Sequence, residues 1–449
     1  MTSAAVPDDQ ATTDTVELLR DLIRNACVND GSPDSGQEHR SVATLERFFQ
    51  GSSLTWEIVE PHPGRTSLVA RHRGTDPEAP ALLLLGHLDV VPVARGWQHD
   101  PFAAELVDGV VWGRGALDML HLTAAYATVI RELAATGTRL RGDLVFAAVA
   151  DEEAGGGFGA RWLAENRPEL VRADGVLSES GGVPLSVDSE VRGVTVTVGE
   201  KGISTRRLAV SGHPGHASTP WGSSNAVVTA AQAVGRIVEH PVPPVIDELW
   251  PQYVGALGVD HDLAAALTDP ARIDGALGSL GRLAGLAHAV THTTISPDVI
   301  RGGDAINVIP AHAEVELDIR TLPGVSPDDV DRHLVEALGP LADRVEISRI
   351  SDNPAARSTS DTALFRALGE AVSAAYPQAH AIPVIAPGGS DSRYFRSQGI
   401  PAYGFGLLSP GWNHADVRRL LHSTDERVDV ASVALVTSAL RRIVRSVLG

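Results

Sequence analysis

The stretch Leu82-Leu83-Leu84-Leu85-Gly86-His87-Leu88-Asp89-Val90-Val91-Pro92 decides the fold of this chain. Four consecutive leucines between Pro80 and Gly86 form an apolar run of the length expected for a strand buried in a parallel sheet. His87 and Asp89 follow at its carboxyl end, two residues apart, so both side chains can project from the same side. In open α/β sheets, ligand sites are built at this end. The pair indicates either a metal ligand with its supporting carboxylate or a histidine held by a local aspartate.

Length, composition and charge limit what the chain can do. Its 449 residues are enough for two or three domains, and 43% hydrophobic with 21% charged residues is typical of a globular protein. The formal net charge of −19 disfavours nucleic acid or a membrane as partner, because both require a basic surface. Cys27 is the only cysteine, which excludes an internal disulfide and a cysteine-based zinc site. Any metal must therefore be held by His, Asp and Glu.

The N-terminal residues 1–14, MTSAAVPDDQATTD, are predicted to form a loose tail. They lack the basic and apolar regions of a signal peptide, and no run in the chain reaches the length of a transmembrane helix. We therefore expect a cytoplasmic protein.

Strands and helices are predicted to alternate along both ends of the chain. The first part contains strands at 66–71, 81–85, 109–113, 143–150 and 175–177 and helices at 15–27, 38–49, 117–136 and 158–166. The last part, from about Ser358, contains helices at 362–376, 392–397 and 430–448 and strands at 381–386 and 403–406. This alternation indicates a doubly wound α/β layer.

The pattern changes near Val194, where polar and apolar residues alternate. Residues 193–200 and 202–211 are predicted to form half-buried antiparallel strands. After them we expect a helix at 224–239, strands at 291–300 and 311–321, a helix at 327–338 and a strand at 345–350. This β-α-β-β-α-β order suggests a separate ferredoxin-like module. We expect one catalytic domain from residues 1–198 and 356–449, interrupted by an inserted domain at 199–355. The residues of the Ala/Gly/Leu-rich stretch 255–290 indicate no role for it.

Further motifs place acidic side chains beside predicted strands. Asp118 ends the segment Gly113-Arg114-Gly115-Ala116-Leu117-Asp118 at the start of a helix, where an aspartate is also common as an N-cap. Asp151, Glu152 and Glu153 directly follow a buried strand, and they repel one another unless a cation is present. One such carboxylate can ligate a metal while its neighbour accepts a proton from water, although a solvated acidic loop is the plainer alternative.

Two more residues complete a candidate ligand set. Glu179 follows another strand in Glu179-Ser180-Gly181-Gly182, and His422 opens the segment His422-Ser423-Thr424-Asp425-Glu426-Arg427. The full set consists of His87, Asp118, Glu153, Glu179 and His422. These nitrogen and oxygen donors could hold two zinc ions, with one carboxylate bridging them. So many strand-end donors in one layer favour metal binding over unrelated local roles.

Two other interpretations are weaker. Gly155–Ala160 fits the dinucleotide-binding pattern G-x-G-x-x-A, which would make the chain an NAD-dependent oxidoreductase. The carboxylates of residues 151–153 would repel the pyrophosphate, and the motif comes deep in the domain rather than after its first strand. A serine hydrolase lacks support because the sequence has no G-x-S-x-G turn, and Ser180 lies in Glu-Ser-Gly-Gly.

The chain resembles the M20 family of zinc-dependent metallohydrolases, which includes aminoacylases, deacetylases and dipeptidases. The resemblance covers nearly the whole chain and rests on the ordered motifs GHLDVVP, GRGALDM, ADEEAG, ESGG and HSTDERV. It implies a zinc-exopeptidase-like doubly wound mixed sheet with an inserted ferredoxin-like α+β lid and dimerisation domain. It also implies two Zn²⁺ ions per chain, which Co²⁺ or Mn²⁺ could replace, and a homodimer.

The resemblance also assigns roles at the metal site. The implied ligands are His87 and Glu179 for one zinc, Glu153 and His422 for the other, and Asp118 as the bridge between them. Glu152 is implied as the general base, and Asp89 as the residue that orients the first histidine. The peptide bond Asp118–Met119 is expected to be cis. Leu120 and His121 stand where many members have Lys-Gly, but these positions are not ligands.

In the inserted domain, residues 211–218 resemble the family's G-x-x-G-H-x-S loop. Its histidine, His216, is expected to cross a dimer interface and stabilise the oxyanion in the neighbouring active site. Asn307 would hydrogen-bond the scissile region of the substrate, and Arg320 would bind a substrate carboxylate. A surface salt bridge is the alternative for this arginine.

Residues 388–394, Gly-Gly-Ser-Asp-Ser-Arg-Tyr, resemble an aminoacylase-like motif. Arg393 is implied as a second carboxylate clamp, with Gly389 in the same substrate-binding segment, because a guanidinium binds a carboxylate bidentately. The expected function is hydrolysis of the amide bond of N-acyl-L-amino acids. A dipeptidase or carboxypeptidase is the close alternative, and a catalytically silent binding protein is an alternative from a different class.

Overall fold

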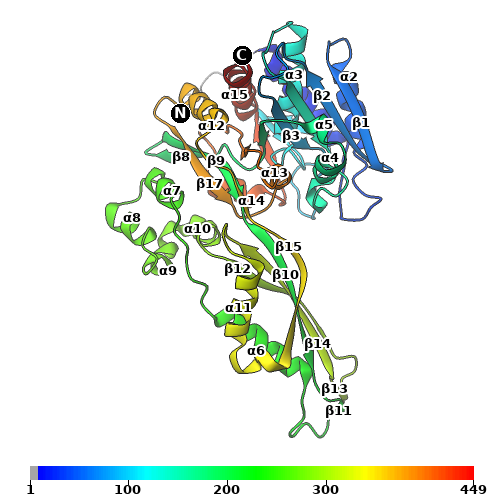
Figure 1. Ribbon diagram of the computed structural model, residues 1–449, viewed down its shortest axis with the longest axis vertical. Coiled ribbons are helices and arrows are strands. Elements are labelled where there is room, and N and C mark those ends of the chain that lie inside the picture. The colour runs from blue at the N-terminus through cyan, green and yellow to red at the C-terminus, as the bar shows by residue number, and fades with distance from the viewer. Residues whose placement is uncertain (1–8) are drawn as a thin grey trace.

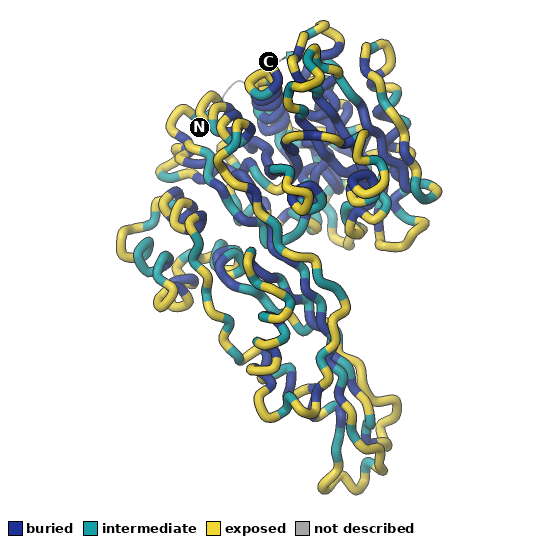
Figure 2. The backbone as a smooth tube through the Cα atoms, viewed as in Figure 1, coloured by how far each residue is buried: buried dark blue, intermediate teal, exposed yellow. Residues whose placement is uncertain are grey.

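The computed structural model describes residues 9–449, and Figure 1 shows an elongated molecule with a broad part and a narrow part. The broad part contains the segments coloured blue to cyan and orange to red, and the narrow part comes mainly from the middle of the chain. Buried residues concentrate in the broad part, whereas the far tip of the narrow part is largely exposed (Figure 2).

A ten-stranded mixed sheet forms the centre of the broad part. Its strands follow the order β1-β2-β6-β3-β7-β18-β9-β16, and β17 and β8 also pair with β9. Their bounds are β1 Thr55–His62, β2 Arg65–His72, β3 Leu82–His87, β6 Leu144–Val149, β7 Gly175–Ser178, β8 Pro184–Val187, β9 Glu190–Glu200, β16 Ala356–Arg357, β17 His380–Ala386 and β18 Ala402–Gly404. The leucine run forms β3, which lies parallel to both β6 and β7 and is buried throughout. The expected α/β fold with a mixed sheet is confirmed.

Alternate leucines of β3 serve two different cores. Leu82 and Leu84 pack on one face of the sheet, whereas Leu83 and Leu85 pack on the other, so the run must be apolar at every position. The first face is covered by α1 Gln10–Arg24, α2 His39–Phe49, α3 Leu120–Ala135, α12 Ala363–Ala375 and α15 Val430–Leu448. The second face is covered by α4 Ala160–Asn166, α5 Pro168–Val171 and α13 Ser392–Arg396.

The narrow part is built on a four-stranded antiparallel sheet in the order β12-β14-β10-β15. The strands are β10 Gly202–Ser211, β12 Thr294–Gly302, β14 His312–Thr321 and β15 Val345–Asn353. Helices α6 Ala226–Glu239 and α11 Pro327–Leu338 pack on this sheet around a separate core that includes Leu208, Leu317 and Leu334. This element and strand order is that of a ferredoxin-like unit. The short strands β11 Gly215–His216 and β13 Val308–Ile309 pair at its far tip (Figure 1).

Between α6 and β12 the chain forms a group of short helices, which we call the helical excursion. It comprises α7 Trp250–Ala256, α8 His261–Leu267, α9 Ile273–Ala276, η2 Leu277–Leu283 and α10 Ala284–Thr291. These helices share a small core that includes Trp250 and Tyr253. The core continues onto Ile382 and Val384 of β17, so the excursion packs against the large sheet.

Two sequence predictions are wrong in detail. Helix α1 begins at Gln10 rather than Thr15, because the Asp9 carboxylate accepts a hydrogen bond from the Thr12 N–H at 2.8 Å and caps the helix. Residues 10–14 of the expected tail are therefore helical, and residues 1–8 lie outside the described residues. Residues 193–200 are buried in β9 of the large sheet rather than half-buried, because β8, β17 and β18 pair with them.

The remaining elements are small. They are β4 Glu105–Val107, β5 Val110–Trp112, β19 Arg427–Asp429, η1 Glu152–Ala154, η3 Gly339–Arg344 and α14 His414–Leu420. Strands β19, β5 and β4 form a three-stranded sheet that joins the C-terminal region to the turn before α3. From residue 9 onward, no helix has both the length and the apolar character needed to cross a membrane.

Candidate metal centre

The candidate ligands gather at the carboxyl ends of neighbouring parallel strands. His87 is the last residue of β3, Glu153 lies on η1 just after β6, and Glu179 follows β7. Since β3 lies between β6 and β7, these three side chains reach the same edge of the sheet. Asp118 comes from the turn before α3, and His422 comes from the loop after α14.

The five side chains form two overlapping sets of three. One set is His87, Asp118 and Glu179, and the other is Asp118, Glu153 and His422, with the donor atoms of each set within 4.8 Å of one another. Asp118 belongs to both. Its Oδ1 lies 3.5 Å from His87 Nε2, and its Oδ2 lies 3.2 Å from His422 Nε2. Asp118 therefore turns one carboxylate oxygen toward each set, which is the arrangement that a bridging ligand requires.

The electrostatics of this cluster suit a metal. His87 Nε2 is buried and has no hydrogen-bond partner, while Nδ1 lies 2.9 Å from the backbone oxygen of Asp89. A neutral ring that donates from Nδ1 presents the Nε2 lone pair to two carboxylates, and a cation bound between them would stabilise this arrangement. Burial and neighbouring carboxylates raise the pKa of Glu179, and hydrogen bonds to Asp118 and Glu153 raise the pKa of His422 to about 10. These nitrogen and oxygen donors fit a divalent ion such as zinc.

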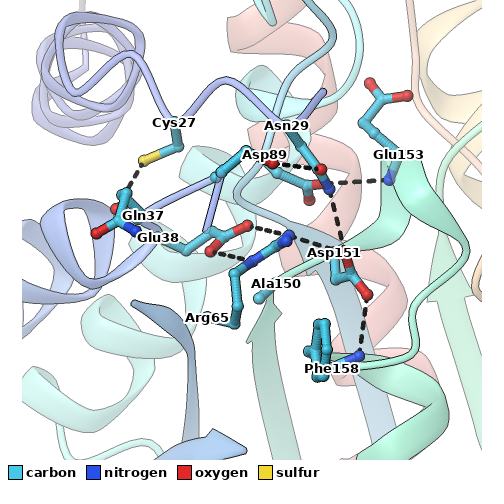
Figure 3. Close-up of polar contacts among 12 residues, drawn as sticks. Cys27, Asn29, Gln37, Glu38, Arg65, Asp89, Ala150, Asp151, Glu153 and Phe158 are labelled. Atoms are coloured by element: carbon cyan, nitrogen blue, oxygen red, sulfur yellow. Dashed lines mark hydrogen bonds and ion pairs between the residues drawn. The ribbon is translucent and has the colours of Figure 1, made fainter. Parts of the chain in front are cut away.

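Asp89 supports the site in two ways. Its backbone oxygen holds the ring of His87, and its carboxylate accepts the backbone N–H groups of Glu152 and Glu153, each at 3.1 Å. The carboxylate also accepts a hydrogen bond from Asn29 at 2.8 Å (Figure 3). The side chain of Asp89 therefore fixes the turn that carries the two glutamates, and the closest contact to the histidine comes from its backbone.

A buried polar network lies behind this turn (Figure 3). Arg65 donates from Nε and Nη2 to the two oxygens of Glu38, at 3.0 and 2.8 Å, and Nη2 also lies 2.8 Å from Asp151. Asn29 links Asp151 to Asp89. One member of the acidic triplet 151–153 is therefore neutralised by Arg65, which reduces the repulsion noted in the sequence. Asn29, Glu38 and Arg65 could not be predicted as part of the site, because they lie upstream of its motifs in the sequence.

The loop that carries Asp118 is held by another buried group. Glu426 pairs with Arg114 at 2.7 Å and accepts the backbone N–H groups of Leu117 and Asp118 at 2.8 and 2.9 Å. Glu426 stands in the motif that contains His422, but its contacts with Arg114 and with the backbone before α3 could not be predicted from that motif. The Asp118–Met119 peptide bond is cis, as the resemblance implied.

One cavity of about 590 Å³ adjoins the cluster, and Glu152, Arg393 and Gly389 line it together with candidate metal ligands. Burial, opposed by His87, raises the pKa of Glu152 well above its ordinary value. Arg393 donates from Nε to the backbone oxygen of Ser390 at 2.7 Å. A Cβ atom at position 389 would lie 2.4 Å from the Arg393 Nη2, so glycine gives the guanidinium room.

The other predicted substrate-binding residues are either already paired or lie away from the cavity. Arg320 lines the cavity, but its guanidinium pairs with both carboxylate oxygens of Asp318, at 2.7 and 2.8 Å. His216 and Asn307 are exposed at the far tip of the narrow part and do not line the cavity. Within one chain, the structure therefore brings together the candidate ligands, Glu152 and the two arginines, but not His216 and Asn307.

Comparisons with known proteins identify the family of the chain. Residues 83–446 match the model of peptidase family M20/M25/M40. The chain is 28% identical to Aminoacylase-1 from Homo sapiens, over 93% of this chain and 91% of that protein. It is 29% identical to Probable carboxypeptidase S-like 2 from Dictyostelium discoideum, over 81% of this chain and 71% of that protein.

The fold is also that of a solved structure. The crystal structure of an M20 family metallo-carboxypeptidase from Sulfolobus solfataricus superposes with a TM-score of 0.70, covering 97% of this chain and 99% of that chain at 17% identity. The family match spans the strands, the turn and the loop that carry the candidate ligands. The chain therefore belongs to peptidase family M20/M25/M40 and is a metal-dependent hydrolase of amide or peptide bonds.

Proposed function

We propose that the protein is a di-zinc amidohydrolase that cleaves the amide bond of N-acyl-L-amino acids. The observation that carries this proposal is the shared cavity, in which Glu152, the bridging candidate Asp118 and the guanidinium of Arg393 line one space. N-acyl amino acids present an amide bond one carbon away from a free carboxylate. A carboxylate clamp beside a general base suits that arrangement.

In the proposed mechanism, each side chain has a separate task. The ligands are His87, Asp118 and Glu179 for one zinc and Asp118, Glu153 and His422 for the other. Bound zinc supplies Lewis-acid polarisation of the carbonyl and a lower pKa for water. Glu152 accepts a proton from the attacking water and then donates it to the leaving nitrogen as the C–N bond breaks. The products are a carboxylic acid and a free amino acid.

The substrate carboxylate is assigned to Arg393. Its guanidinium lies in the loop 388–394, which Glu200 holds by accepting the Ser390 N–H at 2.6 Å and the Ser390 hydroxyl at 2.9 Å. This support keeps the clamp at a fixed distance from the base. Arg320 is assigned a secondary role, because a substrate would have to compete with Asp318 for it.

We propose that the oxyanion is stabilised by His216 of a second copy of the chain. His216 and Asn307 are exposed at the tip, where they cannot serve the cavity of their own chain without a large movement of the narrow part. A homodimer through residues 199–355, the proposed inserted domain, would present both residues to the neighbouring catalytic domain. The division into catalytic segments 1–198 and 356–449 and the cytoplasmic location also stay predictions from the sequence.

A carboxypeptidase or dipeptidase is the second candidate. It would use the same base and the same clamp for a C-terminal carboxylate, and the similarity to the Dictyostelium discoideum protein favours it. The two candidates differ in the group attached to the amide carbonyl, an acyl chain in one and an amino-acid residue in the other.

The test is a hydrolysis panel with zinc-loaded protein, in which N-acyl-L-amino acids are compared with dipeptides of the same C-terminal residue. We expect a higher kcat/KM for the acylated compounds, and loss of activity toward the D-enantiomers. A higher kcat/KM for the dipeptides would replace the proposed function with the second candidate.

A further inference from the structure

Residues of the helical excursion line the cavity in addition to the candidate ligands and Glu152, and we call this part of its lining the excursion wall. Leu249, Trp250 and Tyr253, at the start of the excursion, line the cavity together with Leu286 and Val290 of α10. The leucine, valine and tryptophan side chains among them cannot ligate a metal or act as a general acid, and the Tyr253 hydroxyl lies 3.1 Å from His414 Nδ1. The proposed mechanism therefore leaves this wall without a role.

The polar atoms of the wall are already satisfied elsewhere. Trp250 Nε1 donates to the backbone oxygen of Leu267 at 2.8 Å, and the Tyr253 hydroxyl lies 3.1 Å from His414 Nδ1. Asp247 also lines the cavity, but its Oδ1 accepts the backbone N–H groups of Leu249 and Trp250. What this wall presents to the cavity is therefore largely hydrocarbon and aromatic surface.

Helix α10 contributes side chains both to the core of the excursion, which Ala287 and Val290 contact, and to the cavity, which Leu286 and Val290 line. Ala287 is buried in the core of the excursion, which anchors the helix to the rest of the molecule. Leu286 and Val290 are four residues apart, so they lie on one face of the helix, and both are only half-buried beside the cavity. Apolar side chains that line a cavity without being covered are typical of a surface that binds an apolar ligand.

The size of the cavity limits which ligand fits. A methylene group takes up about the 30 Å³ of a water molecule in the liquid, so a ten-carbon chain needs roughly 300 Å³. The cavity of about 590 Å³ has room for such a chain beside an amino-acid head group, whereas an acetyl group would leave the excursion wall uncovered. Arg393 lies on a different segment from this wall, so the carboxylate and the acyl chain of a substrate can bind to separate parts of the site.

We propose that the helical excursion forms an acyl subsite, and that the substrates are amino acids with a medium- or long-chain apolar acyl group. This inference rests on the proposed function and names its substrate class. Leu286 and Val290 determine acyl specificity by contacting the chain, and Trp250 and Tyr253 form the rest of the apolar surface. The stretch 255–290, which carries no motif, thereby gains a function.

The first experiment compares N-acetyl-, N-hexanoyl- and N-dodecanoyl-L-alanine with zinc-loaded protein. We expect kcat/KM to rise about threefold to fourfold for each added methylene until the cavity is filled. A parallel series of N-acetyl-L-amino acids with growing side chains is expected to rise less. A steeper rise in the side-chain series would assign the apolar wall to the amino acid and overturn the acyl assignment.

The second experiment places bulk in the subsite. Leu286→Trp is expected to lower the ratio of kcat/KM for dodecanoyl over acetyl substrate by about tenfold. Gly285→Trp is the matched control, because Gly285 is exposed on the same helix, has no neighbour near its Cβ position and does not line the cavity. The control should leave the ratio unchanged. Equal ratios in the two variants would overturn the proposal. A general loss of folded protein lowers kcat/KM for both substrates equally, so it does not change the ratio.

Equilibrium binding separates this inference from the proposed function. In zinc-loaded Glu152→Gln protein, N-dodecanoyl-L-alanine should bind at least tenfold more tightly than N-acetyl-L-alanine. If no N-acyl amino acid is hydrolysed by the unmodified protein but this preference is found, the proposed function fails and the apolar subsite stands. If hydrolysis is found but neither binding nor kcat/KM depends on chain length, the subsite fails and the proposed function stands.

Discussion

At the scale of the residue, Glu152 is the side chain on which the proposed chemistry depends. Its backbone N–H is held by Asp89 and its carboxylate lines the cavity, yet it belongs to neither ligand set. Glu152→Gln keeps the size of the side chain but cannot accept the proton. We expect kcat to fall by about 10²–10⁴-fold while metal content, measured by elemental analysis, stays unchanged. Glu165→Gln, at an exposed ion pair on α4, is the control, and near-normal turnover in Glu152→Gln would exclude it as the base.

Arg65 is the residue on which the support of this turn depends. Its side chain is buried between Glu38 and Asp151, so Arg65→Met would leave two buried carboxylates without their cation. We expect the free energy of unfolding in urea to fall by about 3–5 kcal/mol. Arg161→Met, which breaks an exposed pair, should cost about 1 kcal/mol or less. Similar losses in the two variants would mean that the buried network contributes no more than a surface ion pair.

At the scale of the element, the strongest predictions came from β3 and the strands beside it. An apolar run between Pro80 and Gly86 can only be buried on both faces, and the residues after it must then reach the ligand edge of the sheet. The burial of β9 could not be predicted in this way, because its partners β8, β17 and β18 are set by tertiary pairing. Strand β1 was missed because it is a largely exposed edge strand that contains Pro61.

The residues of the candidate site also differ in whether the sequence could predict them. The ligands and Glu152 occur in short motifs after predicted strands, so residue type and position both indicated them. Glu426, Arg65 and Asn29 act through backbone or buried side-chain contacts between segments distant in sequence, and no local pattern reports such contacts. The role of the helical excursion could not be predicted either, because the position of its short helices depends on packing against β17.

The junction between β9 and β10 gives an element-scale prediction about pH. Burial and the nearby Arg320 lower the pKa of Lys201 to about 7, while its Nζ donates to the backbone oxygens of Ala289 and His292. The unfolded chain therefore binds more protons than the folded chain between about pH 7 and pH 10, so folding stability from this group rises with pH there. The rise is at most about 1.4 kcal/mol per pH unit.

Urea unfolding at pH 7 and pH 9 measures this effect. The increase in the free energy of unfolding between the two values should be larger in the unmodified protein than in Lys201→Met, which has no titrating group at the junction. An identical increase in both proteins would mean that Lys201 does not titrate in this range in the folded state.

At the scale of the whole molecule, the elongated shape separates the tip from the cavity (Figure 1). If His216 serves the neighbouring chain, Glu152→Gln in one chain and His216→Ala in the other both damage the same site of a mixed dimer. One of the two sites in each mixed dimer then keeps both residues, so co-expression should restore about a quarter of the unmodified activity if pairing is random. Each variant alone should be nearly inactive. No recovery in mixed dimers isolated by two affinity tags would contradict action across the interface.

The central claim is that the two overlapping ligand sets hold the metal ions on which hydrolysis depends. The most direct test is a zinc titration of chelator-stripped protein, in which bound zinc and hydrolysis of an N-acyl-L-amino acid are measured at each addition. We expect activity to return as two ions per chain are taken up, and Asp118→Ala, which removes the shared carboxylate, to lower uptake at both sites. Full activity of the stripped protein, or hydrolysis that does not follow zinc uptake, would contradict this claim.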